Sequence, residues 1–465
     1  MGLKRVLVAN RGEIAVRIIR ALFDEGIEAV LAVSEADRDS LGAQLADRAI
    51  CIGPASPAES YLDIPRLVAA ATLTGCDALH PGYGFVSERP ELSQACADAG
   101  IVFVGPSPEA MRRSGDKLVA REAAGELGIS IGDGSDAVGS EAEARGVADA
   151  VGFPLLLKAA AGGGGRGMRL VQSGDDLGAA FSAAAAEARQ AFGDGRLFVE
   201  RFVQRARHVE VQVLADAHDN VIHLGHRDCT LQRRYQKLIE EAPAPGLSAE
   251  LESEMLSAAT ALIGSLRYRG AATCEFLVDE ERQSYGFLEV NARLQVEHGV
   301  TEMVTGVDIV REQLRIAAGE PLSVEQEDVR VDGHAIEARI NAESPERGFE
   351  PSPGRISHWV APVGSYVRVD TACFAGSTVP PHYDSLVAKV IALGDDRPQA
   401  IARLTHALAH LRVDGIATTA QFAREVLRHP DVVAGRLHTR WLEDEFLSRW
   451  QSAGAQRDAR ISSTA

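Results

Sequence analysis

The segment from Glu289 to Glu297, which reads EVNARLQVE, combines side chains that could bind cations and an anion side by side. Polar and apolar residues alternate along it, which is typical of an extended chain with one buried face. One face carries two carboxylates, an amide oxygen and a guanidinium. Such a face is unusual for a purely structural strand, but it is well suited to binding ions. The polar face consists of Glu289, Asn291, Arg293, Gln295 and Glu297.

A partner for this segment lies just upstream, in residues 272–278. Residues 285–290 follow after a polar turn, and a symmetric hairpin centred at Arg282 places Glu275 opposite Glu289. Directly opposed Cβ atoms lie about 4.5–5.5 Å apart, so the two carboxylates repel each other unless a cation lies between them. Carboxylate and amide oxygens suit Mg²⁺ or Mn²⁺, which often bridge to substrate phosphates. The alternative is a solvated hairpin, which the neighbouring polar residues disfavour.

A run of glycines, Gly162 to Gly165, follows an apolar strand predicted at residues 154–157. Consecutive glycines cost conformational entropy, but they allow the backbone to approach a phosphate closely and to close over a nucleotide. The G-x-x-x-x-G-K-[ST] pattern is absent. Lys158 before the loop and Lys117 at a helix start are candidate phosphate ligands. A flexible linker and solvated surface amines are the alternatives.

Weaker signals occur where a structural explanation is equally good. Residues 200–203 change polarity at a strand end, which would suit hydrogen bonds to an adenine edge. Residues 232–237 are basic within an acidic chain, and residues 80–85 follow a strand end, where α/β sheets bind ligands. Half-buried strands or salt bridges would equally explain two polar strand faces, formed by His208, Glu210 and Gln212 and by Glu337, Arg339 and Asn341.

The composition excludes several classes of protein. The chain has 465 residues, 46% of them hydrophobic, enough for about three domains with a large core. A net charge of −18 argues against general binding to nucleic acid or membranes, although local basic residues can still hold anionic substrates. The chain shows no signal-peptide pattern and no apolar run of about 18 residues, so we expect a cytoplasmic protein. Six scattered cysteines without a C-x-x-C pair predict neither a zinc site nor disulfides.

Periodicity predicts the elements that position these residues. Strand and helix patterns alternate over about the first 110 residues, which predicts a parallel sheet with helices on both faces. Capped helices are predicted at residues 114–127 and 308–318. After an acidic link at residues 321–331 the pattern is mostly strands, until an amphipathic helix predicted at residues 397–412.

Two groups of motifs resemble known families. FPLLLKAAAGGGGRG (153–167) and FLEVNARL (287–294) resemble the two signatures of ATP-grasp carboxylate–amine ligases. The chain is similar to biotin carboxylases in ANRGEIA, HPGYGFVSE, RHVEVQV, RDCTLQRRYQK, EEAPAP, GHAIEARINAE and PSPG. Each ATP-grasp signature is moderately specific and the ordered set is very specific. The resemblance covers about residues 3–447, nearly the whole chain.

The resemblance implies an α/β fold, α+β overall, in three parts. Residues 1–113 are expected to form a doubly wound domain with a parallel sheet. Residues 114–325 would form the ATP-grasp domain, with a glycine-rich lid at about residues 131–203. Residues 332–446 would form a mostly β domain, followed by a tail at 447–465.

The resemblance also implies an activity, the ATP-dependent carboxylation of biotin on a carrier protein. ATP phosphorylates bicarbonate to carboxyphosphate, which decomposes to CO₂, and a ureido nitrogen of biotin captures the CO₂. This is the first half-reaction of an acetyl-CoA or other acyl-CoA carboxylase. The implied cofactors are ATP and two Mg²⁺ or Mn²⁺ ions, with biotin as a substrate on a separate protein.

Site residues follow from the matching motifs. ATP is expected at Lys117, Lys158, Gly164, Gly165, Glu200, Arg201, Phe202, Val203, His208, Gln232, Tyr235, Glu275 and Glu289. The metal ligands are expected to be Glu275, Glu289 and Asn291. Bicarbonate is expected at Lys237, Arg293, Gln295 and the backbone of Val296. The catalytic set would be Glu297 as general base with Arg293, Arg339 and Lys237, and biotin is expected at Arg339, which would stabilise its enolate, and at Tyr83.

Four features depart from the family pattern. Tyr235 stands where a histidine is usual, and Gly299 replaces a usual proline. Ala161 stands in a loop that often has five glycines, and residues 132–134 lack the usual prolines. We expect these changes to alter nucleotide affinity or lid motion and not the reaction.

Partners follow from what the sequence lacks. It has no Met-Lys-Met biotinylation site and no carboxyltransferase region, so we expect the biotin carrier and the transferase to be separate chains, and the protein to be a homodimer. The final carboxyl acceptor stays open. Two other functions compete with this one: another ATP-grasp carboxylate–amine ligase, and a nucleotide-binding regulatory subunit.

Overall fold

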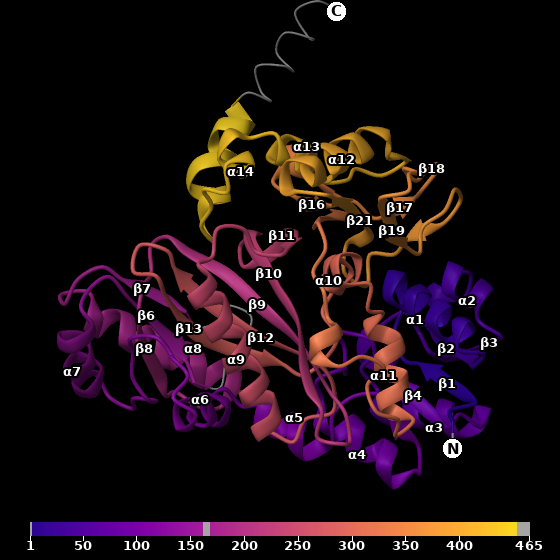
Figure 1. Cartoon of the computed structure of the whole chain (residues 1–465), viewed down its shortest axis with the longest axis horizontal. Coiled ribbons are helices and arrows are strands. Elements are labelled where there is room, and N and C mark those ends of the chain that lie inside the picture. Colours follow the sequence, from indigo (N-terminus) through magenta and orange to yellow (C-terminus); the bar gives the residue numbers. More distant parts are fainter. Residues whose placement is uncertain (1, 161–167, 453–465) are drawn as a thin grey trace, which may run out of the picture.

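The computed structural model describes residues 2–160 and 168–452 of the chain. An N-terminal part, a small lobe and a C-terminal part surround a central sheet; in Figure 1 they lie at the right, at the left and at the top. Gly164, Gly165 and Ala161, named above from the sequence, lie outside the described residues, as do residues 453–465 of the expected tail. Within the described residues, no helix is long and apolar enough to cross a membrane.

The N-terminal part contains a parallel sheet with helices on both faces, as predicted. Its elements are β1 (Arg5–Val8), α1 (Gly12–Asp24), β2 (Glu28–Ser34), α2 (Leu41–Leu45), β3 (Arg48–Gly53), α3 (Ile64–Thr74), β4 (Ala78–His80), α4 (Pro90–Asp98) and β5 (Val102–Phe103). The strand order is β3-β2-β1-β4-β5, and every pairing is parallel. Val6 and Val8 of β1 pack in the core that contains α1, whereas Leu7 packs with α3 and α4.

One antiparallel sheet joins the central and C-terminal stretches of the chain. Its strands are β9 (Ala206–Ala215), β10 (Val221–Arg233), β11 (Gln236–Ala242), β12 (Gly270–Asp279), β13 (Ser284–Asn291), β14 (His334–Asn341), β19 (Val367–Thr371) and β21 (Leu386–Gly394). They follow the order β13-β12-β9-β10-β11-β14-β21-β19. The link at residues 321–331 therefore separates strands that pair directly, Glu240 of β11 with Glu337 of β14. The predicted domain limits stay a prediction.

Strand β9 shows why this sheet holds a polar site. It is buried along its whole length, and its valines pack in an apolar core with helix α9 (Ala249–Ser265). His208, Glu210 and Gln212 occupy the alternate positions and are also buried. Because buried polar groups need hydrogen-bond partners, this second face requires complementary side chains from neighbouring strands.

The small lobe is a three-stranded antiparallel sheet with two helices. It consists of α7 (Glu141–Val151), β6 (Leu155–Ala159), β7 (Arg169–Val171), α8 (Leu177–Phe192) and β8 (Leu197–Arg201). The strand order is β7-β6-β8, and the lobe has its own apolar core. It lies at the left of Figure 1, beside β12 and β13. A lobe with its own core can keep its internal structure if it moves as one body.

The remaining elements connect or cover the sheets. The helices are α5 (Pro108–Gly115), α6 (Lys117–Glu126), α10 (His298–Thr305), α11 (Ile309–Ala317), α12 (Arg397–His410), α13 (Ala420–Leu427) and α14 (Pro430–Val433). The short strands are β15 (Glu343–Ser344), β16 (Glu350–Pro351), β17 (Gly354–Arg355), β18 (His358–Val360), β20 (Thr378–Val379) and β22 (Arg412–Asp414).

The helix predicted from residue 114 begins at Lys117, because the Asp116 side chain accepts hydrogen bonds from the first-turn amides.

Candidate active site

The hairpin of β12 and β13 brings together the two carboxylates predicted to bind metal. Glu275 pairs with Glu289, as expected. The symmetric hairpin was wrong in detail, because the register shifts after Glu275 and Phe276 pairs with Phe287. Leu288 is then the extra residue of a bulge, which moves the centre of the turn and keeps the two carboxylates opposed.

The polar segment is a strand only in its first part, which corrects the prediction of an extended chain to Glu297. Strand β13 ends at Asn291, and helix α10 begins at His298. Arg293 takes over the local hydrogen bonding: its guanidinium donates to Asn291 Oδ1 at 3.0 Å and to Gln295 Oε1 at 2.7 Å. Such bonds between near neighbours compete with a strand ladder. The segment becomes a buried, irregular connection.

Glu297 lies fully buried between two cations. Lys237 Nζ is 2.7 Å from its Oε1 atom, and Arg339 Nη2 is 2.9 Å from its Oε2 atom. Burial raises the pKa of Glu297, but Lys237 and Arg339 outweigh burial and hold the pKa well below its ordinary value. Glu297 is therefore a carboxylate at neutral pH, which is the state that a general base needs.

Lys237 is the centre of the charge network. Besides Glu297, its ammonium group contacts Glu210 at 2.6 Å and Glu275 at 2.9 Å. Glu210 also binds the fully buried Arg227 at 2.6 Å. The sequence analysis did not select Glu210 or Arg227 as site residues. The alternation of polar and apolar residues along β9 could have pointed to Glu210, but a half-buried strand explained it equally well.

A cleft of about 230 Å³ between the small lobe and the β12–β13 hairpin gathers the residues predicted to bind ATP. Lys158 and Arg121 both bind Glu200 at one wall. Gln232 Nε2 lies 2.7 Å from His208 Nδ1. The lining includes Lys117, Lys158, Glu200, Arg201, Phe202, Val203, His208, Gln232, Tyr235, Glu275 and Glu289. The cleft has charged and apolar walls, as nucleotide binding requires.

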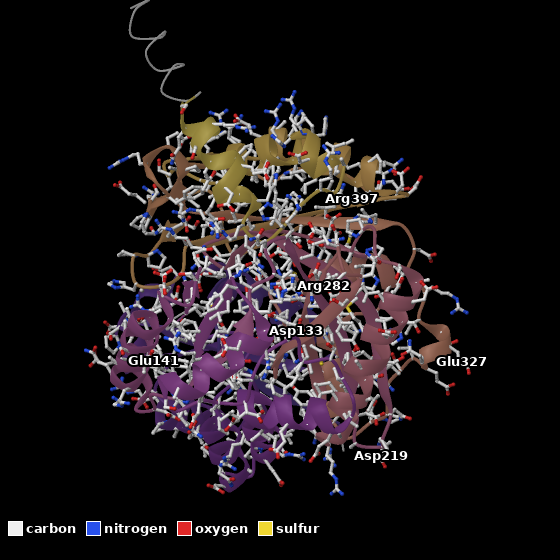
Figure 2. All side chains as sticks on the ribbon, turned by 90° about the vertical axis from the view of Figure 1, so that its left-hand side faces the viewer. Asp133, Glu141, Asp219, Arg282, Glu327 and Arg397 are labelled. Carbon is white, nitrogen blue, oxygen red and sulfur yellow. The ribbon has the colours of Figure 1, made fainter. Side chains whose placement is uncertain are left out.

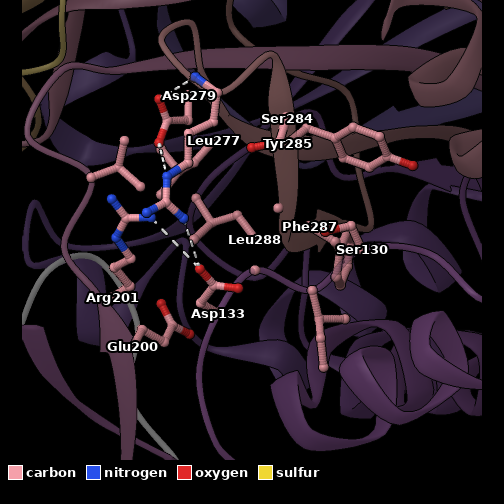
Figure 3. A pocket seen from close by; sticks show the side chains of 15 residues that line it. Ser130, Asp133, Glu200, Arg201, Leu277, Asp279, Ser284, Tyr285, Phe287 and Leu288 are labelled. Carbon is pink, nitrogen blue, oxygen red and sulfur yellow. Dashed lines mark hydrogen bonds and ion pairs between the residues drawn. The ribbon is translucent and has the colours of Figure 1, made fainter. Parts of the chain in front are cut away.

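A second pocket, of about 180 Å³, adjoins this cleft where the small lobe leaves the body of the protein. Asp133 lies 3.7 Å from the guanidinium group of Arg201 and 3.3 Å from that of Arg282, and Figure 3 shows Asp133 and Arg201 together at this pocket. Arg201 belongs to the lobe and Arg282 to the hairpin turn. Asp133 and Arg282 also lie close together in Figure 2. Asp133 thus ties the hinge of the lobe to the hairpin.

Close backbone contacts surround residues 132–134, one of the departures from the family pattern. Gly132 has φ +75°, and a Cβ atom on Gly286 of β13 would lie 3.0 Å from the Gly132 Cα atom. A Cβ atom on Gly134 would lie 2.8 Å from the carbonyl oxygen of Val199 in β8. A side chain at Gly286 or at Gly134 would therefore push the hinge segment and the neighbouring strand apart.

Tyr235, the departure nearest the nucleotide cleft, lies in the two-residue turn between β10 and β11. Arg234 and Tyr235 have φ +49° and +64°, and the flanking Arg233 and Gln236 pair with each other. Positive φ at both central residues is the geometry of a type I′ hairpin. Tyr235 is 63% exposed and lines the rim of the cleft, where it can contact a ligand.

The two residues expected at biotin come from different parts of the chain. Arg339 of β14 contacts Glu297 at 2.9 Å and Glu240 at 2.5 Å. The Tyr83 hydroxyl donates to Glu13 at the start of α1. The structure thus places Arg339 at the base, while Tyr83 is held by a residue that the sequence analysis did not select.

The predicted metal ligands fit a divalent cation chemically. Glu275 and Glu289 offer carboxylate oxygens, and Asn291 adds an amide oxygen that accepts a bond from Arg293. Lys117 binds Glu289 at 2.8 Å, so protein cations already balance these charges. Hard oxygen donors of this kind suit Mg²⁺ or Mn²⁺, with phosphates completing the coordination.

Comparison with known proteins decides the family. Residues 2–111 match the family profile described as "Biotin carboxylase, N-terminal domain", and residues 337–444 match "Biotin carboxylase C-terminal domain". Residues 116–325 match "Carbamoyl-phosphate synthase L chain, ATP binding domain". The chain belongs to the biotin carboxylase family. It is an enzyme of the ATP-dependent ligase class.

Full-length relatives support the same assignment. Biotin carboxylase 1 of Bacillus subtilis is 47% identical over 95% of this chain and 98% of its own. Biotin carboxylase of Pseudomonas aeruginosa is 48% identical over 96% and 99%. Mouse mitochondrial pyruvate carboxylase is 45% identical, but only 38% of its length is matched.

Solved biotin carboxylase structures share the fold. The Campylobacter jejuni enzyme has a TM-score of 0.91 and 44% identity, covering 95% of this chain and 98% of that one. The biotin carboxylase domain dimer of Hydrogenobacter thermophilus 2-oxoglutarate carboxylase, solved with MgADP, ADP and bicarbonate, has a TM-score of 0.90 and 41% identity, covering 96% and 98%. The predicted fold is confirmed.

Proposed function

We propose that this biotin carboxylase uses Glu297 as the general base that activates bicarbonate for phosphorylation by ATP. The observation that carries the proposal is the fully buried Glu297 carboxylate, held by Lys237 and Arg339 next to the cleft that gathers the residues predicted to bind ATP. Bicarbonate is a weak nucleophile, so a positioned base beside cationic anchors is what the reaction needs.

Arg293, Gln295, Lys237 and the Val296 backbone would hold bicarbonate beside this base. Arg293 and Gln295 are already linked at 2.7 Å, so the two groups are positioned before the anion binds. Glu297 takes the bicarbonate proton, and a bicarbonate oxygen attacks the γ-phosphorus of ATP, releasing ADP. Metal ions bound at Glu275, Glu289 and Asn291 would neutralise phosphate charge.

Arg339 would serve the second step of the reaction. Carboxyphosphate decomposes to CO₂ and phosphate, the phosphate takes the proton of a ureido nitrogen of biotin, and that nitrogen attacks CO₂. The enolate-like ureido oxygen that forms is an anion, and the Arg339 guanidinium lies at the same buried position as the base. A fixed cation at a developing negative charge is an effective catalyst. Tyr83 would contribute a further contact to biotin.

The partners follow by comparison with the relatives. We infer that the carrier of biotin and the carboxyltransferase are separate chains, because relatives named biotin carboxylase match this chain over almost their whole length. A homodimer is proposed because the Hydrogenobacter relative is described as a dimer. The relatives include parts of pyruvate and 2-oxoglutarate carboxylases, so the final acceptor stays open.

The test is ATP hydrolysis by the purified chain. Hydrolysis should require bicarbonate and Mg²⁺ or Mn²⁺, and free biotin should stimulate it. Release of phosphate and formation of carboxybiotin from labelled bicarbonate should agree in rate when biotin is saturating. ATP hydrolysis that is indifferent to bicarbonate would favour another ATP-grasp ligase.

A further inference from the structure

The irregular segment after β13 is fixed through two successive backbone carbonyls. His298 Nδ1 lies 2.8 Å from the carbonyl oxygen of Gln295. Lys389 Nζ donates to the carbonyl oxygen of Val296 at 2.8 Å. Because a peptide is planar, a fixed carbonyl also fixes the N–H group of the same peptide. His298 and Lys389 therefore set both peptides that flank Val296, and Lys389 orients the one that leads into Glu297.

Lys389 is an unusual residue for its position in β21, a strand that pairs on both sides, with β14 and β19. Its side chain is fully buried, and its ammonium group lies 3.3 Å from Glu13 and 3.6 Å from Asp370. An apolar side chain would fill this place in a sheet at lower desolvation cost, because buried ion pairs add little net stability. A structural ion pair between the N- and C-terminal parts is one explanation, and it predicts no effect on any particular substrate.

The contacts of Lys389 extend through Glu13 to Tyr83, a residue proposed to bind biotin. The Glu13 oxygen that lies near Lys389 also accepts the hydrogen bond from the Tyr83 hydroxyl. Three direct contacts thus run from Val296 through Lys389 and Glu13 to Tyr83. Val296 and Tyr83 belong to the regions assigned above to bicarbonate and to biotin.

We propose that Lys389 is a positioning residue that fixes the position of the bicarbonate site relative to the biotin site. The proposal rests on the proposed roles of Val296, Glu297 and Tyr83. On one side, the bond from Lys389 to the Val296 carbonyl fixes the peptide between Val296, proposed to bind bicarbonate, and Glu297, the proposed base. On the other side, the contact with Glu13 fixes the Tyr83 hydroxyl that would meet biotin.

The first test is Lys389→Met, which keeps the length of the side chain and removes the hydrogen bond and the charge. We expect kcat/KM for bicarbonate to fall at least about tenfold, because a misplaced reactant costs rate steeply. The KM for free biotin should rise as well. The Kd for ATP, measured by calorimetry, should stay within about twofold, since among the described residues the partners of Lys389 (Glu13, Asp370 and Val296) do not line the nucleotide cleft.

Two further variants keep the test decisive if Lys389→Met fails to fold. The double variant Glu13→Gln/Lys389→Met removes both charges of the buried pair and should show the same kinetic changes. Glu13→Gln alone keeps the Lys389 bond to Val296. It should raise the KM for biotin while kcat/KM for bicarbonate stays within about twofold of wild type.

Controls separate this inference from the bicarbonate site itself. Arg403→Met removes another cation-to-carbonyl bond of β21, from Arg403 to Leu393 at 2.6 Å, and should leave all three constants unchanged. Arg293→Ala should lower kcat/KM for bicarbonate. If Arg293→Ala lowers it and Lys389→Met does not, Lys389 has only a structural role. If neither lowers it, the proposed bicarbonate site is wrong.

Discussion

The central charges of the proposed active site, Lys237 and Glu297, are each held by opposite charges. Lys237 contacts three carboxylates, and Glu297 contacts two cations. Under the proposed roles, bicarbonate would compete for Lys237 and metal ions for Glu275. An anion that takes Lys237 away from Glu297 would weaken the contact that depresses the pKa of Glu297. Binding of bicarbonate would then raise the basicity of the group proposed to activate it.

Replacing the base tests its role directly. Glu297→Gln keeps the size of the side chain and removes the basic oxygen. We expect kcat for bicarbonate-dependent ATP hydrolysis to fall by about 10²–10⁴-fold. ATP binding should stay measurable by calorimetry, because Glu297 does not line the nucleotide cleft. Turnover close to wild type would refute the assignment.

Arg339 should matter most when biotin is present. Arg339→Ser removes the cation proposed to stabilise the ureido oxygen, and we expect formation of carboxybiotin to fall by about 10²-fold. Bicarbonate-dependent ATP hydrolysis without biotin should fall less. The exposed Arg355→Ser serves as a control for loss of an arginine. An equal loss in both assays would place Arg339 in the first step instead.

Glu240 provides a pH dependence of stability. Burial, followed by the charge of Glu297, raises its pKa to about 7 against the opposing effect of Arg339. Because the folded pKa lies above that of an unfolded chain, its contribution to stability is complete below about pH 4.5 and is lost as pH rises through about 7. Glu240→Gln resembles the protonated form. The free energy of unfolding of this variant, relative to wild type, should therefore rise between about pH 5 and 8 in denaturant titrations.

At the scale of elements, the hairpin that holds the metal ligands also supports the hinge of the small lobe. Gly286 of β13 lies against Gly132, and Arg282 in the turn binds Asp133. The N–H group of Phe287 donates to the Ser130 carbonyl at 2.7 Å. A displacement of the hinge therefore reaches the strand that carries Glu289.

A larger residue at Gly286 should disturb this hinge. Gly286→Val would bring side-chain atoms into the Gly132 backbone, so the KM for ATP should rise by about tenfold or more as the lobe is misplaced. Gly125→Ala is the matched control, since a Cβ atom there meets nothing within 4 Å and alanine favours its helix by up to about 1 kcal/mol. Wild-type ATP kinetics in Gly286→Val would show that the contact has no role in lobe position.

Sequence patterns predicted local elements well and their assembly less well. The Glu275–Glu289 pair and the helix at Arg397 followed from local periodicity and were confirmed. The end of β13 at Asn291 was missed, because side-chain bonds from Arg293 interrupt an alternation that looks unbroken in sequence. Lys389 could not be selected, since its partners Glu13, Val296 and Asp370 come from three separate segments of the chain and no local pattern connects them to Lys389.

At the scale of the whole molecule, the shared sheet makes the central and C-terminal parts one structural unit. A chain truncated to residues 1–331 would leave β11 without its partner β14 and expose the edge of a large sheet. We expect this fragment to aggregate or to unfold without cooperativity in calorimetry. A soluble fragment that binds ATP with wild-type affinity would show instead that residues 332–446 are an independent domain.

The contacts of Lys237 also reveal the curvature of the sheet. Lys237 on β11 and Glu275 on β12 are three strands apart, which is about 14 Å in a flat sheet, yet their charged atoms lie 2.9 Å apart. The two long side chains cover much of this distance, and a sheet that curls with its polar face concave shortens the rest. Register shifts in β10 and β12, which increase local twist, occur on the strands that have to bend. The spacing of the carboxylates and cations of the site therefore depends on the bend of the backbone as well as on side-chain length, and a change that flattens these strands would move these charges apart together.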